Sequence, residues 1–474
     1  MFKIKTPMIA AAAVLALFSG CAAVGPDFKA PAAPESSAYR HAAGKAEAKL
    51  PAAWWTVFGD ATLDALEQRA LQESPSVKAS AERLAAASAQ LGVTRSALTP
   101  QVRVAASIAE SHSSQNTSQG IMLHHTSVKG MDHEIGASMS YEVDAWGRVR
   151  RLVESANAQV QAAEDDHGAV VLTLGSQIAS NYFQLRGLDA QAIILAQALA
   201  SRVETEQLVQ SRFDAGVSNE LDLARARVET ANARAQLVDV QRQRTDIEHA
   251  LAVLVGASPS APLVPAAASP LQALPPQIPV GLPASLLAQR PDLAESVATL
   301  RALNAQVGVA EAAFYPSISL TGSFGFASQP LGDLLKSTSQ QFSVGPLGLS
   351  LPIFDGGRNQ ANLDAVKARY REAAANHVQR LMTALREVED SLNDAQSLQD
   401  QAEVQAQARI AAERAYEVAR ARYERGVSNY LDVTDAQRSA LSTERDGAQI
   451  ATQRLLAAVA VARSMGGGWT LSVN

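Results

Sequence analysis

The chain repeats one segment of its own sequence, and this duplication limits the possible folds more than any other feature. Residues 212–226, RFDAGVSNELDLARA, and residues 422–436, RYERGVSNYLDVTDA, lie 210 residues apart and are identical at eight of fifteen positions. An upstream segment that ends at Pro100 matches one that ends at Pro316, at an offset of 216 residues. Because a repeated unit usually cannot bury its apolar surface alone, the duplication predicts stacking or ring closure.

The twenty prolines are confined to residues 7–100 and 259–352. Proline inside a helix costs about 3 kcal/mol, so the two proline-free ranges predict very long helices. We expect one helical hairpin in each copy, at about 147–255 and about 358–464. The first helix of each hairpin would be roughly 95 Å long if unbroken, which is too long for a compact domain. Gly187 is a candidate interruption of the first one.

Apolar and polar residues alternate between Pro100 and the first long helix, and again between Pro316 and the long helix of the second copy. This alternation predicts strands with one apolar face. The expected strands cover about 101–112, 133–146, 317–328 and 340–353. A change of phase at Gly345-Pro346 predicts a bulge in the last one. The other face carries serine, threonine, glycine and acids, as a wet lumen would, so a membrane barrel is favoured over a soluble sandwich. Four strands are too few to close a barrel, so several chains must share it.

The turn between the two helices of each hairpin has the same sequence, Gly-Val-Ser-Asn. Glycine suits the left-handed position after a helix, and Asn219 and Asn429 are expected to cap the following helices together with Asp222 and Asp432. Capping does not account for the valines, which predict a docking surface on both turns. The residues expected to dock a partner are Gly216, Val217, Ser218, Gly426, Val427 and Ser428.

Residues 1–20 are predicted to be a lipoprotein signal peptide. Their apolar run, from Met8 to Phe18, is shorter than the roughly 20 residues of a membrane-spanning helix. Cys21, the only cysteine, follows this run as in a bacterial lipobox and is expected to carry an N-acyl and an S-diacylglycerol lipid; the alternative is a small buried thiol. Removal of two lysines and no acids with residues 1–20 changes the formal net charge from −6 to −8, which argues against a nucleic-acid partner.

The sequence contains no pattern typical of an enzyme or a cofactor site. Gly466-Gly467-Gly468 precedes Trp469 and the chain end, and no helix with a Lys-Ser pair follows that could hold phosphate. Four histidines gather in the first hairpin loop without the spacing of metal ligands, so we expect a polar surface and no metal. They are His112, His124, His125 and His133.

Taken together, these motifs resemble the OprM/NodT-type outer-membrane efflux lipoproteins, the lipidated branch of the TolC-like outer-membrane factor family. The resemblance covers essentially the whole mature chain. It is carried by CAAVGPDFKAP after the lipobox, WWTVFGDATLDAL from Trp54, LPASLLAQRPDLAESVATLRALNAQVGVAEAAFYPSISL from Leu282, the two GVSN turns, and SMGGGW ending at Trp469.

The resemblance implies an α+β membrane protein that is internally duplicated. Four transmembrane β-strands per chain would contribute to a trimeric twelve-stranded barrel, and coiled-coil hairpins would form a long periplasmic α-helical barrel. The implied domains are the signal peptide at 1–20, a first repeat with an N-terminal strap at 21–258, a Pro-rich linker at 259–290, and a second repeat with a C-terminal tail at 291–474.

The resemblance also implies an outer-membrane exit channel of a tripartite RND-type efflux pump, which passively conducts drugs or other small toxic compounds. Such a channel is a homotrimer in outer-membrane lipid. Its helical turns meet a periplasmic adaptor, which connects it to the inner-membrane transporter. A heavy-metal efflux system or a type I secretion system would use the same fold. A purely structural lipoprotein tether would have no use for amphipathic strands.

A periplasmic gate is implied by the same resemblance. In NYLDVTDAQR, Leu431, Asp435 and Arg438 occupy the places of the residues that narrow OprM-like channels. Leu431 would form an apolar plug, and Asp435 and Arg438 would link neighbouring subunits. The alternative for the charged residues is an ordinary i, i+3 surface pair worth about 0.2–0.5 kcal/mol. Only the second copy has the pair, because the residues 210 positions earlier are Leu221, Arg225 and Val228.

Overall fold

The structure is a computed structural model that describes residues 23–31, 39–40, 50–122, 124, 126–267, 274–278 and 289–470. The chain divides into two compact units, and each unit takes segments from both copies of the repeat. Unit 1 comprises residues 1–31, 84–163 and 296–376, and unit 2 comprises residues 32–83, 164–295 and 377–474. The expected signal peptide, Cys21 and His125 lie outside the described residues.

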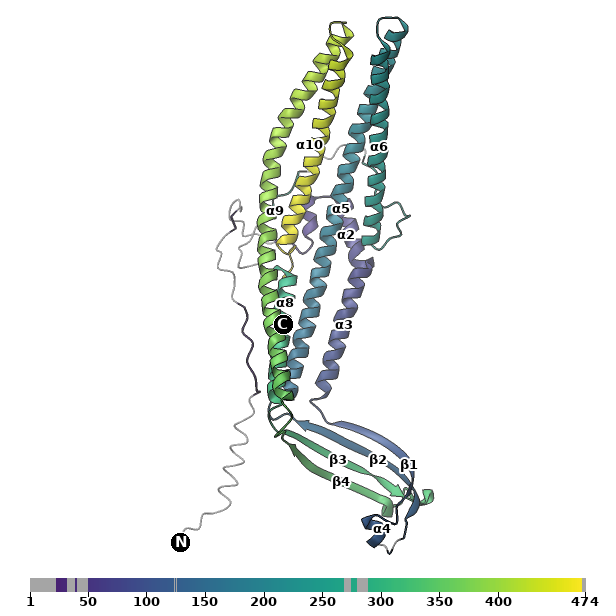
Figure 1. Cartoon of the computed structure of the whole chain (residues 1–474), viewed down its shortest axis with the longest axis vertical. Coiled ribbons are helices and arrows are strands. Elements are labelled where there is room, and N and C mark those ends of the chain that lie inside the picture. The colour runs from purple at the N-terminus through teal and green to yellow at the C-terminus, as the bar shows by residue number, and fades with distance from the viewer. Residues whose placement is uncertain are drawn as a thin grey trace, which may run out of the picture. The chain divides into compact units, whose positions relative to one another are not determined.

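Unit 1 contains one antiparallel sheet with the strand order β1-β2-β3-β4 (Figure 1). The strands are β1 (Gln101–His112), β2 (Lys129–Val143), β3 (Ser317–Ser328) and β4 (Gln340–Ser350). β2 lies closer to the N-terminus than the expected range of about 133–146, because the chain turns into the next helix after Val143. β4 ends at Ser350 instead of about residue 353, since Pro352 has no N–H to donate to a neighbouring strand. A short helix, α4 (Ser118–Met122), lies between β1 and β2, and the turns η3 (Leu331–Asp333) and η4 (Ser337–Ser339) lie between β3 and β4.

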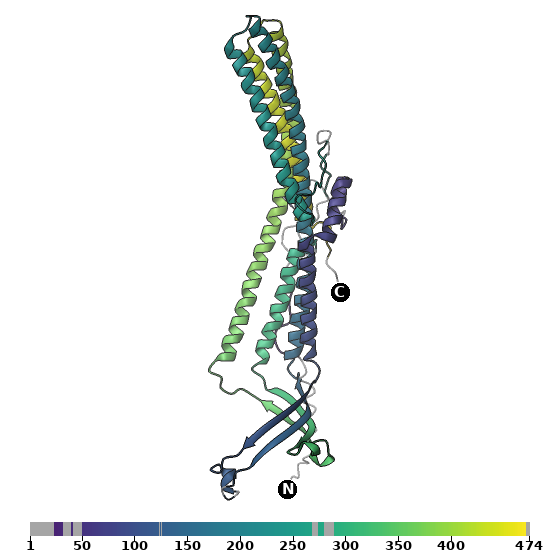
Figure 2. The ribbon, with the colours of Figure 1, turned by 90° about the vertical axis from the view of Figure 1, so that its right-hand side faces the viewer.

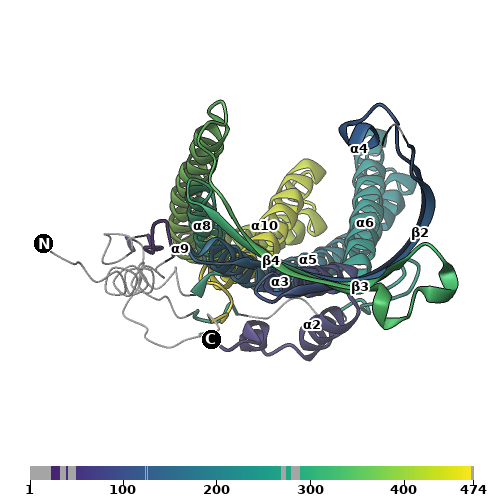
Figure 3. The same ribbon diagram turned by 90° about the horizontal axis from the view of Figure 1, so that it is seen from below.

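The predicted bulge in β4 is confirmed. Leu320 pairs with Leu347, and Gly322 pairs with Val344, so two residues of β4 lie opposite one residue of β3. Such a bulge bends a strand and increases its twist. The sheet is visibly curved when it is viewed from below (Figure 3).

The apolar side chains of the two edge strands are exposed. A soluble sandwich would bury these side chains against a second sheet, whereas a barrel strand directs them at lipid. The exposed apolar face therefore agrees with the expected membrane strands. Its largest side chains are Val102, Val104 and Ile108 on β1, and Phe342, Val344, Leu347 and Leu349 on β4.

Among the described residues, three helices of matching length recur in the same order in both copies (Figures 1 and 2). They are α3 (Pro75–Ser96), α5 (Arg148–Asp214) and α6 (Glu220–Leu254) in the first copy, and α8 (Pro291–Ala312), α9 (Arg358–Glu424) and α10 (Tyr430–Ser464) in the second. Their lengths are 22, 67 and 35 residues in both copies. The prediction of long proline-free helices is confirmed. No helix within the described ranges is both long enough and apolar enough to cross a membrane.

The expected interruption at Gly187 is wrong, because α5 is continuous through this residue. Gly187 serves close packing instead. A Cβ atom at this position would lie 2.3 Å from Oγ1 of Thr452 on α10. The glycine therefore lets α10 approach α5 more closely than any other residue would allow.

The first helix of each hairpin, α5 or α9, begins at the carboxylate of an aspartate. Asp144 accepts hydrogen bonds from the backbone N–H groups of Val149 and Arg150, both at 2.9 Å. Asp355 accepts from those of Gly357 and Asn359, both at 2.9 Å. A carboxylate at a helix N-terminus satisfies free N–H groups and interacts favourably with the helix dipole. These caps define where the sheet ends and each long helix starts.

The main apolar core of unit 2 lies where the turn η1 (Trp54–Phe58) and the helix α2 (Ala61–Glu73) pack against α5, α6 and α10. Trp54, Tyr182 and Leu251 are almost fully buried in this core. Asp60 caps the start of α2 and also accepts a hydrogen bond of 2.6 Å from the Tyr182 hydroxyl. The segment around Trp54 is thereby fixed to the hairpins.

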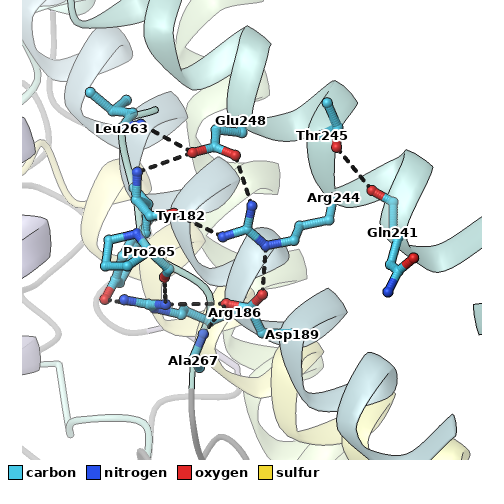
Figure 4. A network of polar contacts seen from close by, with 11 residues as sticks. Tyr182, Arg186, Asp189, Gln241, Arg244, Thr245, Glu248, Leu263, Pro265 and Ala267 are labelled. Carbon is cyan, nitrogen blue, oxygen red and sulfur yellow. Dashed lines mark hydrogen bonds and ion pairs between the residues drawn. The ribbon is translucent and has the colours of Figure 1, made fainter. Parts of the chain in front are cut away.

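A polar network fixes the start of the Pro-rich segment to α5 and α6 (Figure 4). Asp189 of α5 accepts from Nε of Arg244 at 2.7 Å and from the backbone N–H of Ala267 at 3.1 Å. Arg244 donates to the carbonyl of Val264 at 2.8 Å, and Glu248 accepts from the N–H of Val264 at 3.1 Å. Every charged group of this network has a partner, so its burial is compensated.

Candidate functional site at the helical tips

The turns at the ends of the two hairpins have the same backbone hydrogen bonds. Val217 N–H donates to the carbonyl of Arg212 at 2.9 Å, and Val427 N–H donates to that of Arg422 at 3.0 Å. Gly216 and Gly426 have φ angles of 73° and 76°. Nothing lies within 4 Å of a Cβ atom built on either glycine, so the backbone conformation alone favours glycine there.

The expected N-caps of the following helices are confirmed for the asparagines. Asn219 accepts from the N–H of Asp222 at 2.8 Å, and Asn429 accepts from that of Asp432 at 3.0 Å. The carboxylate of Asp432 accepts from the Ser428 hydroxyl at 2.6 Å. Local sequence therefore determines both turns.

The two turn valines are exposed in the monomer. Val217 is 74% exposed, and Val427 is 64% exposed. Each valine follows the left-handed glycine of a hydrogen-bonded turn, and its side chain lies on the outside of that turn. An apolar side chain held in this way is suited to contact with another protein.

The structure brings two of the three expected gate residues into a weak contact. Arg438 Nη1 lies 4.0 Å from Oδ1 of Asp435, and both side chains are more than half exposed. Leu431 is 41% exposed in the first turn of α10. An exposed pair at this distance contributes little to stability.

The stronger partner of Arg438 is Glu229 of α6, which sequence reasoning missed. Nε of Arg438 donates to Oε1 of Glu229 at 3.0 Å, and Nη2 of Arg438 contacts the same oxygen. Oε2 of Glu229 lies 3.2 Å from Nη2 of Arg202 on α5. Glu229 is 5% exposed and Arg202 is 4% exposed, so one buried carboxylate joins α5, α6 and α10. We call these three residues the Arg-Glu-Arg cluster.

The electrostatics of this cluster follow from burial. Burial lowers the pKa of the Arg202 guanidinium, although the charge of Glu229 opposes this effect. The hydrogen bond from Arg438 to Glu229 raises the pKa of Arg438, and the attraction of the Glu229 charge adds to it. Buried Arg202 therefore depends on Glu229 for compensation, whereas the charge of Arg438 is also solvated.

A seven-residue spacing was the signal that could have revealed Arg202. Leu195, Arg202 and Val209 are spaced by seven residues on α5, and all three are buried. A charged residue in an otherwise apolar core position requires a charged partner nearby. Arg438 is not identifiable from spacing as the second partner of Glu229, because α6 and α10 are distant in sequence.

The loop histidines do not gather around a metal site in the part of the chain that the structure describes. No group of three or more histidine, cysteine or acidic side chains there is arranged to hold a metal ion. The Nδ1 atom of His133 lies 3.0 Å from the backbone carbonyl oxygen of Gln329.

Comparisons with known proteins agree with the fold. The sequence matches the outer membrane efflux protein family at residues 66–257 and 282–467. It is 33% identical over 461 residues to the outer membrane protein OprJ of Pseudomonas aeruginosa, and the match covers 97% of this chain and 95% of OprJ. It is 30% identical over 456 residues to the cation efflux system protein CusC of Escherichia coli, and this match covers 95% of this chain and 96% of CusC. The crystal structure of the Campylobacter jejuni CmeC outer membrane channel matches with a TM-score of 0.90 at 26% identity, covering 96% of each chain.

These matches confirm the expected fold class, and the two separate family matches confirm the duplication. Each chain supplies four strands to a trimeric barrel in the outer membrane and helical hairpins to a periplasmic helical barrel. The relatives are channel components of efflux pumps and not enzymes, so the chain is the outer-membrane channel of a tripartite pump with an adaptor and an inner-membrane transporter. The chain belongs to the outer membrane efflux protein family.

Proposed function

We propose that this channel passively conducts drugs and other small toxic compounds from the periplasm to the exterior. The observation that carries the proposal is the pair of identical turns with exposed valines next to a charged cluster, a geometry suited to a docked and gated channel entrance. Relatives over most of the chain are named for antibiotic and toluene efflux, which supports small organic compounds. Deletion of the gene should raise sensitivity to drugs and dyes in a panel assay. Unchanged sensitivity throughout the panel would contradict the proposal.

Heavy-metal export is the second candidate, because CusC is named as a cation efflux protein. The same panel decides between the two cargoes when metal salts are included. A deletion strain that is sensitive to metal salts alone would favour the cation system over the drug system.

For the gate, we propose that Leu431 narrows the periplasmic end as an apolar plug and that Asp435 and Arg438 link neighbouring subunits around the pore. Support comes from the position of all three residues in the first turns of α10 and from the anchoring of Arg438 by buried Glu229. Asp435→Ala combined with Arg438→Ala should raise single-channel conductance in planar lipid bilayers. The matched control is Arg225→Ala with Val228→Ala at the equivalent positions of the first copy, which should leave conductance unchanged. Equal conductance of wild type and the Asp435/Arg438 variant would exclude this gate.

For the adaptor, we propose that both turns form the docking surface. Its residues are Gly216, Val217, Ser218, Gly426, Val427 and Ser428. The exposed valine side chains support this assignment because only the backbone N–H of each valine takes part in capping. Val217→Asp with Val427→Asp should abolish co-purification of the adaptor. Val238→Asp, which places the same charge at an exposed valine of α6, is the control and should retain it. Adaptor binding by both variants would argue against docking at the turns.

For membrane attachment, we propose that residues 1–20 are removed and that Cys21 carries the lipid. The support is the sequence alone, with an apolar run directly before the only cysteine. Labelled palmitate should enter the wild-type protein and not the Cys21→Ala variant. Incorporation into both proteins would refute the assignment.

A further inference from the structure

Arg212, near the end of α5, caps the C-terminal end of α9 in the same chain. Its Nη1 donates to the carbonyl of Tyr423 at 3.2 Å, and its Nη2 donates to that of Glu424 at 3.0 Å. The guanidinium carbon lies 4.5 Å from the centre of the Tyr423 ring. A cation at this end of a helix satisfies free carbonyls and interacts favourably with the dipole, and an aromatic ring beneath it adds a cation–π contribution. The first hairpin therefore holds the tip of the second.

Each residue of this contact has an equivalent in the other copy. Arg422 occupies the position of Arg212, Phe213 that of Tyr423, and Asp214 that of Glu424, all at an offset of 210 residues. The hairpin helices have equal lengths, and the turns have equivalent hydrogen bonds. The second hairpin thus presents an arginine donor, Arg422, equivalent to Arg212. The first hairpin presents an aromatic ring and two carbonyl acceptors, those of Phe213 and Asp214, equivalent to those that Arg212 contacts.

Arg422 does not contact Phe213 or Asp214 of its own chain. Arg422 is exposed, and its side chain makes no hydrogen bond, ion pair or ring contact within the described residues. Phe213 is 37% exposed, whereas Tyr423, which Arg212 covers, is 6% exposed. Tyr423 is covered by Arg212 and also packs in an apolar cluster with Val209, Leu223 and Tyr430 of its own chain.

A ring of three duplicated chains contains six hairpins, whose contacts alternate between those within a chain and those between chains. We propose that Arg422 of each subunit caps the C-terminal end of α5 in the next subunit, with its guanidinium over Phe213 of the partner subunit. Its N–H groups donate to the carbonyls of Phe213 and Asp214 of the partner subunit. This contact rests on the trimeric channel and adds the residues that close its ring at the tips.

Proximity labelling in the full-length protein tests the contact. Arg422→Cys with Asp214→Cys, treated in native outer membranes with a short bismaleimide, should yield covalent dimers and trimers on denaturing gels. The matched pair, Arg212→Cys with Glu424→Cys, should be linked within one chain and run as a monomer. The single-cysteine variants control for Cys21, the only native thiol. Monomers alone from the first pair, or oligomers from the second, would overturn the proposal.

A second measurement avoids new thiols. Arg422→Gln should lower the temperature at which the detergent-resistant trimer dissociates by several degrees, and Arg422→Lys, which retains a cation at the helix end, should restore part of this loss. No shift for Arg422→Gln, or equal shifts for both variants, would overturn the contact. Wild-type trimer mass and conductance are measured in parallel. A conducting trimer that fails the Arg422 tests excludes this contact alone, whereas a wild-type protein that neither trimerises nor conducts contradicts the channel as well.

Discussion

The first hairpin, α5 and α6, and the second hairpin, α9 and α10, end in turns with equivalent hydrogen bonds, but the charges beside these turns differ. Arg438 of the second copy corresponds to Val228 of the first, and buried Arg202 of the first corresponds to Ala412 of the second. Glycine and asparagine, which both copies share, determine the backbone of the turns. The side chains between the hairpins differ between the copies, and only the first copy supplies the buried Arg202 and Glu229 of the Arg-Glu-Arg cluster.

This difference has a consequence for the six hairpins of the trimer. Within a chain, Glu229 joins the first hairpin to α10 through Arg438. At the equivalent contact between chains, the corresponding residues are Ala412, Ser439 and Val228, which carry no charge. The ionic cluster therefore links the hairpins of one chain, and the residues at the equivalent contact between neighbouring chains cannot form it.

The largest effect is expected from Glu229→Ala. This change leaves Arg202 buried without its counter-ion, which typically costs about 3–5 kcal/mol of unfolding free energy. Ser439→Ala, at the equivalent place in the second copy, should cost less than about 0.5 kcal/mol. Thermal unfolding of the detergent-solubilised trimers followed by circular dichroism compares the two. Similar melting temperatures for both variants would show that the copies do not differ in the way described.

A second difference between the copies lies further along α5, where Gly175 accommodates Glu67 of α2. A Cβ atom on Gly175 would lie 3.1 Å from Oε2 of Glu67, whereas the equivalent residue of α9 is Leu385, which packs against apolar side chains. Burial raises the pKa of Glu67 to about 9, with a smaller contribution from the charge of Asp64. Glu67 is therefore protonated in the folded protein at neutral pH.

The sign of its effect on stability follows from this shift. Between the ordinary pKa of 4.5 and about 9, the folded state binds a proton that the unfolded state has lost, so stability decreases as pH rises. Relative to the wild type, Glu67→Gln, which cannot ionise, should raise the unfolding free energy increasingly between pH 4.5 and pH 9, by up to about 1.4 kcal/mol per pH unit, and have no effect of this kind below pH 4.5. Melting temperatures measured from pH 5 to pH 9 test it. Parallel curves for the two proteins would contradict a protonated Glu67.

Much of this fold was predictable from sequence because its signals are local. The absence of proline, the alternating strands and the glycine and asparagine caps act over a few residues, and they placed the hairpins and strands closely. The Arg-Glu-Arg cluster was not predictable, because Glu229 and Arg438 meet through the packing of helices that are 209 positions apart. The division into units was also missed, since each unit combines segments of both copies.

Substitution of the turn glycine should lower the unfolding free energy by a smaller amount, equal in the two copies. Gly216→Ala and Gly426→Ala each force a side chain into the left-handed region, at a cost of about 1–2 kcal/mol. The φ angles of 73° and 76° and the open space around both glycines give no reason for the two costs to differ. Denaturant unfolding of each variant measures them. A difference above about 1 kcal/mol between the two variants would break the equivalence of the turns.

The smallest effect on stability is expected from the exposed charges that distinguish the tips. Arg225 lies 3.7 Å from Asp222 in a partly exposed i, i+3 pair, and Asp435 lies 4.0 Å from Arg438 in an exposed i, i+3 pair. Arg225→Ala and Asp435→Ala should each change the unfolding free energy by less than about 0.5 kcal/mol, because water screens such pairs. Single-channel recordings separate them, since only Asp435→Ala should raise conductance if the second tip alone forms the gate. An equal rise in conductance for Arg225→Ala would assign gating to both tips. The difference in charge between the tips would then not contribute to gating.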